Sequence, residues 1–210
     1  MKRRRIKTSY PGFSLIEIAI VLAILGVLLS GVIKGKDLYD NARLNALIHQ
    51  IQDIQISVQQ FQEKFGALPG DFSKANEQIK NDLINGNGDG QVRDDERNNV
   101  WPHLNAAGLY ISPVEPVSKI GGFISIQSGP KDDLLGTWIV IGEKSGDNNF
   151  GALLTPDQAL FIDKKIDSGS PSSGRVRAYK GDNGTGECID GTGNYNIQNK
   201  KPACILFIEL

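Results

Sequence analysis

The feature that most constrains this chain is an apolar segment near the N-terminus, FSLIEIAIVLAILGVLLSGVI, at residues 13–33. It holds 21 residues and a single charge, Glu17. A helix that rises about 1.5 Å per residue reaches roughly 30 Å over this length, which is the thickness of a bilayer's hydrocarbon core. An ordinary signal peptide is shorter and ends in a small-residue cleavage site. No such site follows Ile33, so the sequence predicts one membrane-spanning helix that stays in the mature protein.

Five positive charges precede the apolar segment. They are Lys2, Arg3, Arg4, Arg5 and Lys7. The whole chain has 23 basic and 24 acidic residues, so the remainder holds 18 basic against 24 acidic. The basic head is typical of a cytoplasmic flank that orients a membrane helix. The acidic excess elsewhere argues against a nucleic-acid partner.

Glu17 is the one charge inside the apolar segment, and a carboxylate near a bilayer interior is costly. One interpretation is that it lies near the start of the helix and reaches the headgroups. The other is that cleavage before Phe13 creates an amine four residues away on the same helix face. In a staggered array, Glu17 of one subunit would then neutralise the amine of its neighbour, although desolvation offsets part of the gain.

The segment KTSYPGFSLIEIAIVLAILGVLLSG resembles the class III signal of type IV pilins and of the pseudopilins of type II secretion. In that family a short basic leader precedes Gly and Phe, and Glu is the fifth residue of the mature chain. These residues are Gly12, Phe13 and Glu17 here. The resemblance implies cleavage after Gly12 by a prepilin peptidase and N-methylation of Phe13 by the same enzyme. One departure is Lys34, where many relatives carry a helix-kinking proline.

The resemblance also implies a location and a set of partners. The chain would cross the bacterial inner membrane once, with its head domain in the periplasm. The assembled filament would be periplasmic or at the cell surface. Besides the membrane and the prepilin peptidase, the partners would be other pilin subunits, in a homo- or heteropolymer, and an inner-membrane assembly platform.

The helical pattern continues beyond the apolar segment. Apolar residues recur at steps of three and four, namely Leu44, Leu47, Ile51, Ile54, Val58, Phe61 and Phe65. No proline occurs between Phe13 and Leu68, and Gly66 with Pro69 supplies a stop. The sequence predicts one helix of about 50 residues. Its stripe could form a coiled-coil seam, but we favour packing on the C-terminal domain, because a sheet needs a helix to cover it.

After Phe65 the sequence pattern changes to short apolar runs separated by Gly, Asn, Asp and Pro. Strands are expected at residues 122–127, 137–142, 175–180 and 203–209. Helices are expected at 94–107 and from Pro156 to about Ile166, the second with Thr155 as N-cap. The predicted fold class is α+β, pilin-like, with a long N-terminal helix packed on a C-terminal domain that contains a small antiparallel sheet.

Four regions are expected along the chain. Residues 1–12 form a cytoplasmic leader peptide, and residues 13–36 form the transmembrane half of the N-terminal helix. Residues 37–66 form its amphipathic half. Residues 67–210 form a globular, pilin-like head domain.

The two cysteines, Cys188 and Cys204, both lie near the C-terminus. In an exported protein such a pair predicts a disulfide, whereas in a cytosolic protein it would be two buried thiols. The export signal favours the disulfide, which would stabilise this tail by about 3 kcal/mol on the chain-entropy model. The pair also resembles the disulfide-bounded loop of many pilins.

Residues 85–96, NGNGDGQVRDDE, fit the twelve-position calcium loop of EF-hands. The candidate ligands are Asn85, Asn87, Asp89, Gln91 and Glu96. Gly90 takes the position where the chain turns sharply. Asn instead of Asp at the first position, and Arg93 at the ninth, weaken the match, and the alternative is a turn that binds no ion. Calcium of modest affinity is the one cofactor that the sequence suggests.

The sequence does not predict an enzyme. Its two histidines, His49 and His103, have no metal-ligand spacing, and we expect a surface or capping role for both. The chain has no GxSxG, P-loop or HExxH motif, and no helix pattern follows the Gly-rich residues 181–193 to cradle a phosphate. Acidic residues are scattered and form no evident catalytic pair.

The function that the sequence predicts is a structural subunit, a major or minor pilin, of a type IV pilus or pilus-like filament. The alternative is a pseudopilin of a type II secretion system. A second alternative, from a different class, is a membrane-anchored calcium-binding or adhesive module. Glu17 discriminates between these classes, because an anchor does not need it and a filament subunit does.

Overall fold

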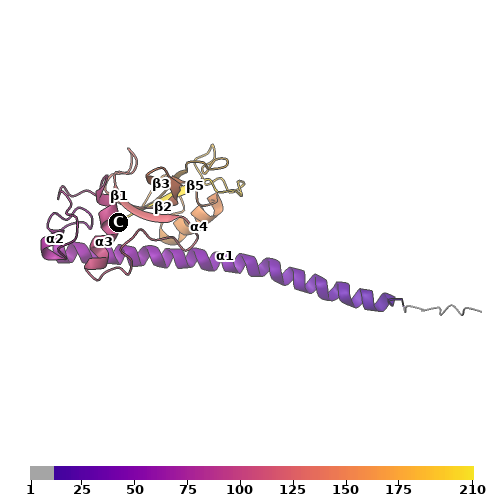
Figure 1. The fold of residues 1–210 in the computed structure, drawn as a ribbon. Coiled ribbons are helices and arrows are strands. Elements are labelled where there is room, and N and C mark those ends of the chain that lie inside the picture. Colours follow the sequence, from indigo (N-terminus) through magenta and orange to yellow (C-terminus); the bar gives the residue numbers. More distant parts are fainter. Residues whose placement is uncertain (1–11) are drawn as a thin grey trace, which may run out of the picture. The chain divides into compact units, whose positions relative to one another are not determined.

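The computed structural model describes residues 12–210, and for residues 29–34 and 37 it describes the backbone alone. The chain divides into two compact units, Met1–Ala42 and Arg43–Leu210. Helix α1, Leu15–Phe65, has 51 residues and contributes to both units (Figure 1). The predicted single helix of about 50 residues is therefore confirmed.

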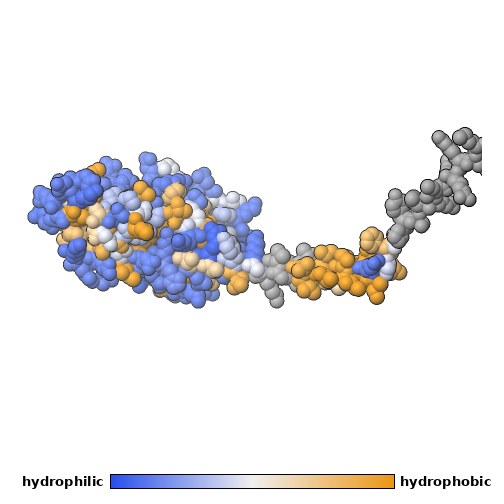
Figure 2. Space-filling model, turned by 60° about the horizontal axis from the view of Figure 1, so that its bottom comes forward, coloured by the Kyte–Doolittle hydropathy of each residue, from blue (hydrophilic) through white to orange (hydrophobic). Residues whose placement is uncertain are grey.

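Within the first unit, α1 presents apolar side chains to solvent. Exposed residues include Leu15, Ile16, Ile18, Ile20, Val21, Leu22, Ile24, Leu25, Val27 and Leu28. Figure 2 shows this apolar surface on the face in view. Among the described residues, no helix combines the length and hydropathy that a membrane crossing requires. The span expected at residues 13–36 stays a prediction.

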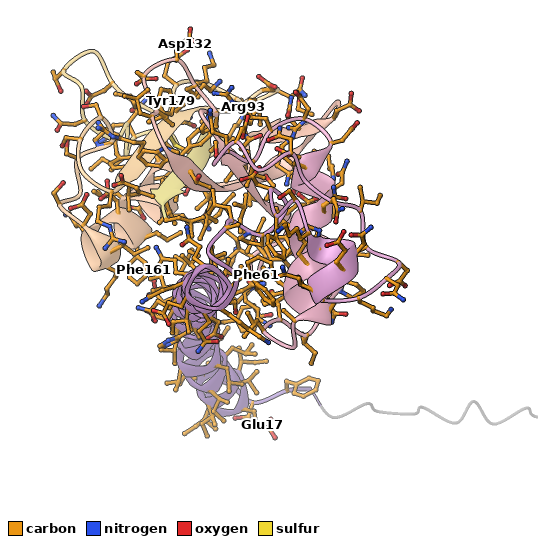
Figure 3. The ribbon with its side chains drawn as sticks, turned by 90° about the vertical axis from the view of Figure 1, so that its left-hand side faces the viewer. Glu17, Phe61, Arg93, Asp132, Phe161 and Tyr179 are labelled. Carbon is orange, nitrogen blue, oxygen red and sulfur yellow. A yellow bond between two sulfur atoms is a disulfide. The ribbon has the colours of Figure 1, made fainter. Side chains whose placement is uncertain are left out.

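Within the second unit, the apolar stripe of α1 lies in the main core. Its buried members are Leu44, Leu47, Ile51, Ile54, Val58 and Phe61, and Phe65 packs against them half-buried. Figure 3 shows Phe61 on the side of α1 that faces the domain. The stripe shares this core with strand residues such as Ile139 and Leu206, so it covers a sheet and does not form a coiled-coil seam.

The sheet has the strand order β1-β2-β5-β4, with every pair antiparallel, and β3 pairs with the far end of β2. The strands are β1 (Phe123–Ser128), β2 (Thr137–Ser145), β3 (Asn148–Gly151), β4 (Val176–Lys180) and β5 (Cys204–Glu209). The predicted α+β class is confirmed, and the four expected strands lie near their predicted bounds. Strand β3 was missed, because asparagine and glycine, which make up most of it, disfavour strands.

The sheet is covered on both faces. One face packs on α1, while the other carries a second apolar cluster, Leu134, Trp138, Val140, Ile205 and Phe207, with Phe150 and Tyr179 half-buried against it. The loop between β1 and β2 covers this outer face, and Lys131 Nζ lies 4.7 Å from the centre of the Phe150 ring. Figure 3 shows Tyr179 and Asp132 on the side of the domain opposite Phe61. Strands β2 and β5 read as continuous apolar runs for this reason.

Three short helices complete the second unit. They are α2 (Ala75–Gln78), α3 (Glu96–Ala106) and α4 (Pro156–Ile166). The Thr155 N-cap is confirmed, since its hydroxyl accepts from Gln158 N and the Gln158 side chain accepts from Thr155 N in a capping box. Helix α3 tolerates Pro102 in its interior. Helix α2 follows the turn after α1 and was not predicted.

The disulfide is confirmed. Cys188 and Cys204 are bonded across 16 residues of sequence, and both are fully buried. The bridged loop is held a second time by Tyr195, whose hydroxyl donates to Oδ2 of Asp163 on α4 at 2.8 Å. Burial raises the pKa of Asp163, because an apolar environment disfavours the charged form.

Candidate functional site

The predicted processing junction lies immediately before helix α1. Gly12, Phe13 and Ser14 are non-helical, and the helix begins at Leu15. Gly12 is exposed and the side chain of Phe13 is 84% exposed. A peptide bond outside a helix is open to a peptidase, so the geometry is compatible with cleavage between Gly12 and Phe13. The basic leader residues lie outside the described residues.

Glu17 caps the start of its own helix. Its Oε2 accepts from Ser14 N at 2.8 Å, while Ser14 Oγ accepts from Ile16 N at 3.2 Å. These two bonds satisfy N–H groups that a helix start leaves without partners, and the carboxylate lies near the positive end of the helix dipole. Our interpretation of the sequence missed this local role, although the pattern Ser-x-x-Glu at residues 14–17 signals it.

The loop at residues 85–96 is built around Asp71, which our interpretation of the sequence had left out. Oδ1 of Asp71 accepts from Gly88 N at 2.7 Å and from Asp89 N at 3.0 Å, and Oδ2 accepts from Gly90 N at 2.9 Å. Asp71 is 2% exposed. A buried carboxylate that accepts three backbone N–H bonds holds the loop to the turn after α1.

Two of the predicted calcium ligands join Asp71 in one cluster. Asp71, Asp89 and Glu96 each place a carboxylate oxygen within 4.8 Å of the other two. Glu96 is fixed by two backbone donors, Asn87 N at 2.8 Å and Arg93 N at 3.2 Å. Three carboxylates at this separation repel one another, and oxygen ligands of this kind suit a hard cation.

The other predicted ligands have different partners. Oδ1 of Asn85 accepts from Asn76 N at 2.9 Å, and its amide donates to Asn76 Oδ1 at 3.0 Å. Oδ1 of Asn87 accepts from Asp89 N at 2.7 Å, and Gln91 N donates to Asp89 Oδ1 at 2.9 Å. The structure therefore turns Asn85 toward α2, and the carboxylate cluster differs from the twelve-position arrangement that the sequence suggested.

Glycine is required where this loop touches the turn. A Cβ at Gly86 would lie 2.3 Å from the carbonyl carbon of Asp71, and one at Gly70 would lie 2.7 Å from Glu96 O. Gly70 also has a φ of 95°. The two segments fit backbone against backbone, which explains why Asp71 can reach three amide groups of the loop.

His103 bonds to the same turn through a backbone amide. Its Nδ1 accepts from Gly70 N at 2.9 Å, so Nε2, which lies 2.8 Å from Ile84 O, carries the proton and donates. The ring is fully buried, so of the expected surface or capping role for His103 the surface position was wrong, while the ring does bond two backbone groups. Burial lowers the pKa of His103, because desolvation disfavours the charged imidazolium.

Comparison with known proteins adds evidence at the N-terminus. Residues 9–33 match the family model described as the prokaryotic N-terminal methylation motif. This chain carries the N-terminal methylation motif. The motif contains Gly12, Phe13 and Glu17, and it supports the type IV pilin and pseudopilin family that these residues suggested.

The remaining comparisons add little. A solved structure described as the major type IV pilin PilA1 from Clostridium difficile aligns with 15% identity and a TM-score of 0.40. The alignment covers 80% of this chain and 92% of that chain. A TM-score this low does not establish a shared fold. No curated protein matches the chain significantly.

Proposed function

We propose that this chain is a structural subunit of a type IV pilus or a related filament. The observation that carries the proposal is the exposed apolar part of α1, which begins at Leu15 and contains Glu17 inside the methylation motif. A monomer gains nothing from exposing apolar side chains on all sides of a helix, whereas a bundle of such helices buries them. Other pilin subunits are therefore the proposed main partners.

Processing would prepare the subunit for this assembly. A prepilin peptidase would cut between Gly12 and Phe13 and methylate the new amine, while the apolar helix holds the chain in the inner membrane. An assembly platform there would add it to the filament. In the filament, the carboxylate of Glu17 would exchange its bond to Ser14 N for the Phe13 amine of a neighbouring subunit, since two opposite charges attract strongly where water is excluded.

Substitution of Glu17 tests this proposal. Glu17→Gln keeps a side-chain oxygen that can accept from Ser14 N, so the helix cap is retained while the charge is removed. We expect processed subunits but a loss of filaments by at least tenfold in sheared, pelleted fractions and by electron microscopy. Glu63→Gln, on the exposed face of the same helix, is the matched control and should assemble normally. Normal assembly of Glu17→Gln would contradict the proposal.

Between the two kinds of filament, we favour a pilus over a secretion pseudopilus. The support is the disulfide between Cys188 and Cys204, which bounds a C-terminal loop as in many pilins. Deletion of the gene should then remove surface filaments and leave type II secretion intact. Loss of secretion with surface filaments unchanged would assign the chain to the pseudopilus instead.

A second proposal, independent of assembly, is a calcium site formed by Asp71, Asp89 and Glu96. Its support is the clustering of three carboxylates within 4.8 Å. Calcium would neutralise their repulsion and link the turn after α1 to the start of α3. With three backbone-bonded carboxylates already in place, we expect an affinity suited to the millimolar calcium of an extracellular medium.

Calorimetry of residues 37–210 with millimolar calcium tests the site. We expect heat of binding for the wild-type chain and none for Glu96→Gln or Asp71→Asn. Asp95→Asn is the matched control, because Asp95 is an exposed neighbour whose side chain does not cap α3. If the wild-type chain gives no heat, the loop is a turn that binds no calcium.

A further inference from the structure

A lysine and an asparagine share one carboxylate where the β2–β3 hairpin meets the loop before β1. Lys144 Nζ donates to Oε2 of Glu115 at 2.7 Å, and Asn149 Nδ2 donates to Oε1 of Glu115 at 2.5 Å. Lys144 lies on β2 and Asn149 on β3. A single carboxylate thus holds a primary amine and a carboxamide next to each other.

The surroundings shield this group on several sides. It lines a hollow of about 230 Å³ whose wall also includes Trp101. Asn149 is 3% exposed, and the side chain of Glu115 is 23% exposed. The ring centre of Phe123 lies 4.9 Å from Lys144 Nζ. The carboxamide and the carboxylate are therefore largely removed from water. The Lys144 side chain is 52% exposed, with an aromatic ring over one side of its amine.

The three ion pairs in the described part of the chain differ in their acids, whereas the side chains of their lysines are all 50–63% exposed. The acids of the pairs Lys80–Asp82 and Lys180–Glu187 are 67% and 62% exposed, against 23% for Glu115. Among the described residues, Glu115 is the one ion-paired carboxylate that also accepts from a side-chain carboxamide. An ordinary surface salt bridge contributes little and needs no such third group.

We propose that Lys144 and Asn149 join in an isopeptide bond, with Glu115 as the proton carrier. Glu115 first accepts a proton from the Lys144 ammonium, which frees the lone pair of the amine. The amine then attacks Cγ of Asn149 and forms a tetrahedral intermediate. Such proton transfer by a placed carboxylate, together with the proximity of the two groups, is what this exchange of amides requires.

The atoms balance without any further reactant. Glu115 gives its proton to Nδ2 of Asn149 and takes one from Nζ of Lys144. The C–Nδ2 bond then breaks, ammonia leaves with the proton that Glu115 holds, and a new Cγ–Nζ bond remains. The products are one amide cross-link and one ammonium ion, and no electron is transferred to or from an outside molecule. The cross-link closes the β2–β3 hairpin beside the turn at residues 145–148.

Mass spectrometry of the full-length chain, purified in detergent, tests the proposal directly. Digestion with a protease that cuts after lysine normally separates residues 132–144 from residues 145–164. Acylation of the Lys144 amine blocks that cut. We expect a single peptide of residues 132–164 that is lighter than its calculated mass by one ammonia, with fragment ions that join Lys144 to Asn149.

Variants separate this bond from other modifications. Lys144→Arg keeps the ion pair but cannot form the amide, and Asn149→Ser removes the acyl group, so each should give the full mass. Glu115→Gln should do the same, because it removes the proton carrier. Lys180→Arg, in the exposed ion pair, is the matched control and should keep the cross-linked peptide. Cleavage after Lys144 with no mass deficit in the wild-type chain overturns the proposal.

Discussion

Both ends of helix α1 carry large apolar side chains, but these side chains lie in opposite environments. Ile24, near the N-terminal end, is 54% exposed, whereas Ile51, near the C-terminal end, is fully buried. The difference lies in the spacing of the apolar residues. Between Leu44 and Phe61 they form one stripe, which selects a single face for packing on the domain. Between Leu15 and Leu28 they occur on every side, so no single face is selected.

The comparison predicts that the largest loss of stability comes from the buried stripe. Phe61→Ala removes a fully buried ring that packs against the rings of Phe65, Phe72 and His103, and it should cost about 3–5 kcal/mol of the free energy of unfolding. Urea unfolding of the chain in mild detergent, followed by tryptophan fluorescence, measures the loss, because both tryptophans lie in the second unit.

The matched variant at the other end is Leu22→Ala, at a residue that is 63% exposed. It should leave the same unfolding curve unchanged and reduce the yield of filaments. If Leu22→Ala destabilises the chain as much as Phe61→Ala does, then the first unit contributes to the core, and the contrast between the two ends is wrong.

The disulfide should give the next largest effect, because it restrains the second unit alone. Replacing both cysteines with alanine should cost about 3 kcal/mol, which is the entropy that a 16-residue bridge removes from the unfolded chain. The same urea titration, with and without reductant on the wild-type chain, measures it. An unchanged midpoint after both changes would show that Tyr195 and Asp163 suffice to hold the loop.

A smaller loss of stability is expected at the turn after α1. Gly86→Ala places a Cβ against the backbone of Asp71, and we expect a loss of roughly 1–3 kcal/mol. Gly191→Ala is the control, because a Cβ there meets nothing within 4 Å. Equal effects of the two changes would mean that the close approach of loop and turn does not occur.

The smallest expected effect is a pH dependence that comes from His103. Burial lowers its pKa in the folded chain, while the unfolded chain titrates near the ordinary value of about 6.5. The unfolded chain thus binds more protons, so stability is full above about pH 6.5 and falls as the pH drops below it. Unfolding curves between about pH 7.5 and 5.5 should show this slope in the wild-type chain.

Two histidine variants assign that slope. His103→Asn should abolish it, because asparagine can accept from Gly70 N without taking up a proton. His49→Gln, at an exposed position on α1, should keep it. A slope that survives in His103→Asn would have to come from another group.

The sequence predicts those parts of the fold that form through contacts between residues close in sequence, and it predicts poorly those that form through distant contacts. Helix α1, the capping box at Thr155 and four strands follow from spacing and neighbouring residues, and the structure confirms them. Strand β3 did not follow, because it forms by pairing with β2 against its own composition. The burial of His103 was also missed, since its partners Gly70 and Ile84 are distant in sequence.

By itself the sequence determined the N-terminal motif, the long helix and the pair of cysteines. The motif and the helix depend on residues that are close together in the sequence, and the disulfide depends on the chemistry of two thiols. Only the tertiary structure brought Asp71 to the loop at residues 85–96, and only it turned Asn85 away. It also brought Glu115 to Lys144 and Asn149 across the sheet edge. The physical reason is that backbone contacts between distant segments, such as Gly86 on Asp71, decide which side chains meet, and no local pattern encodes them.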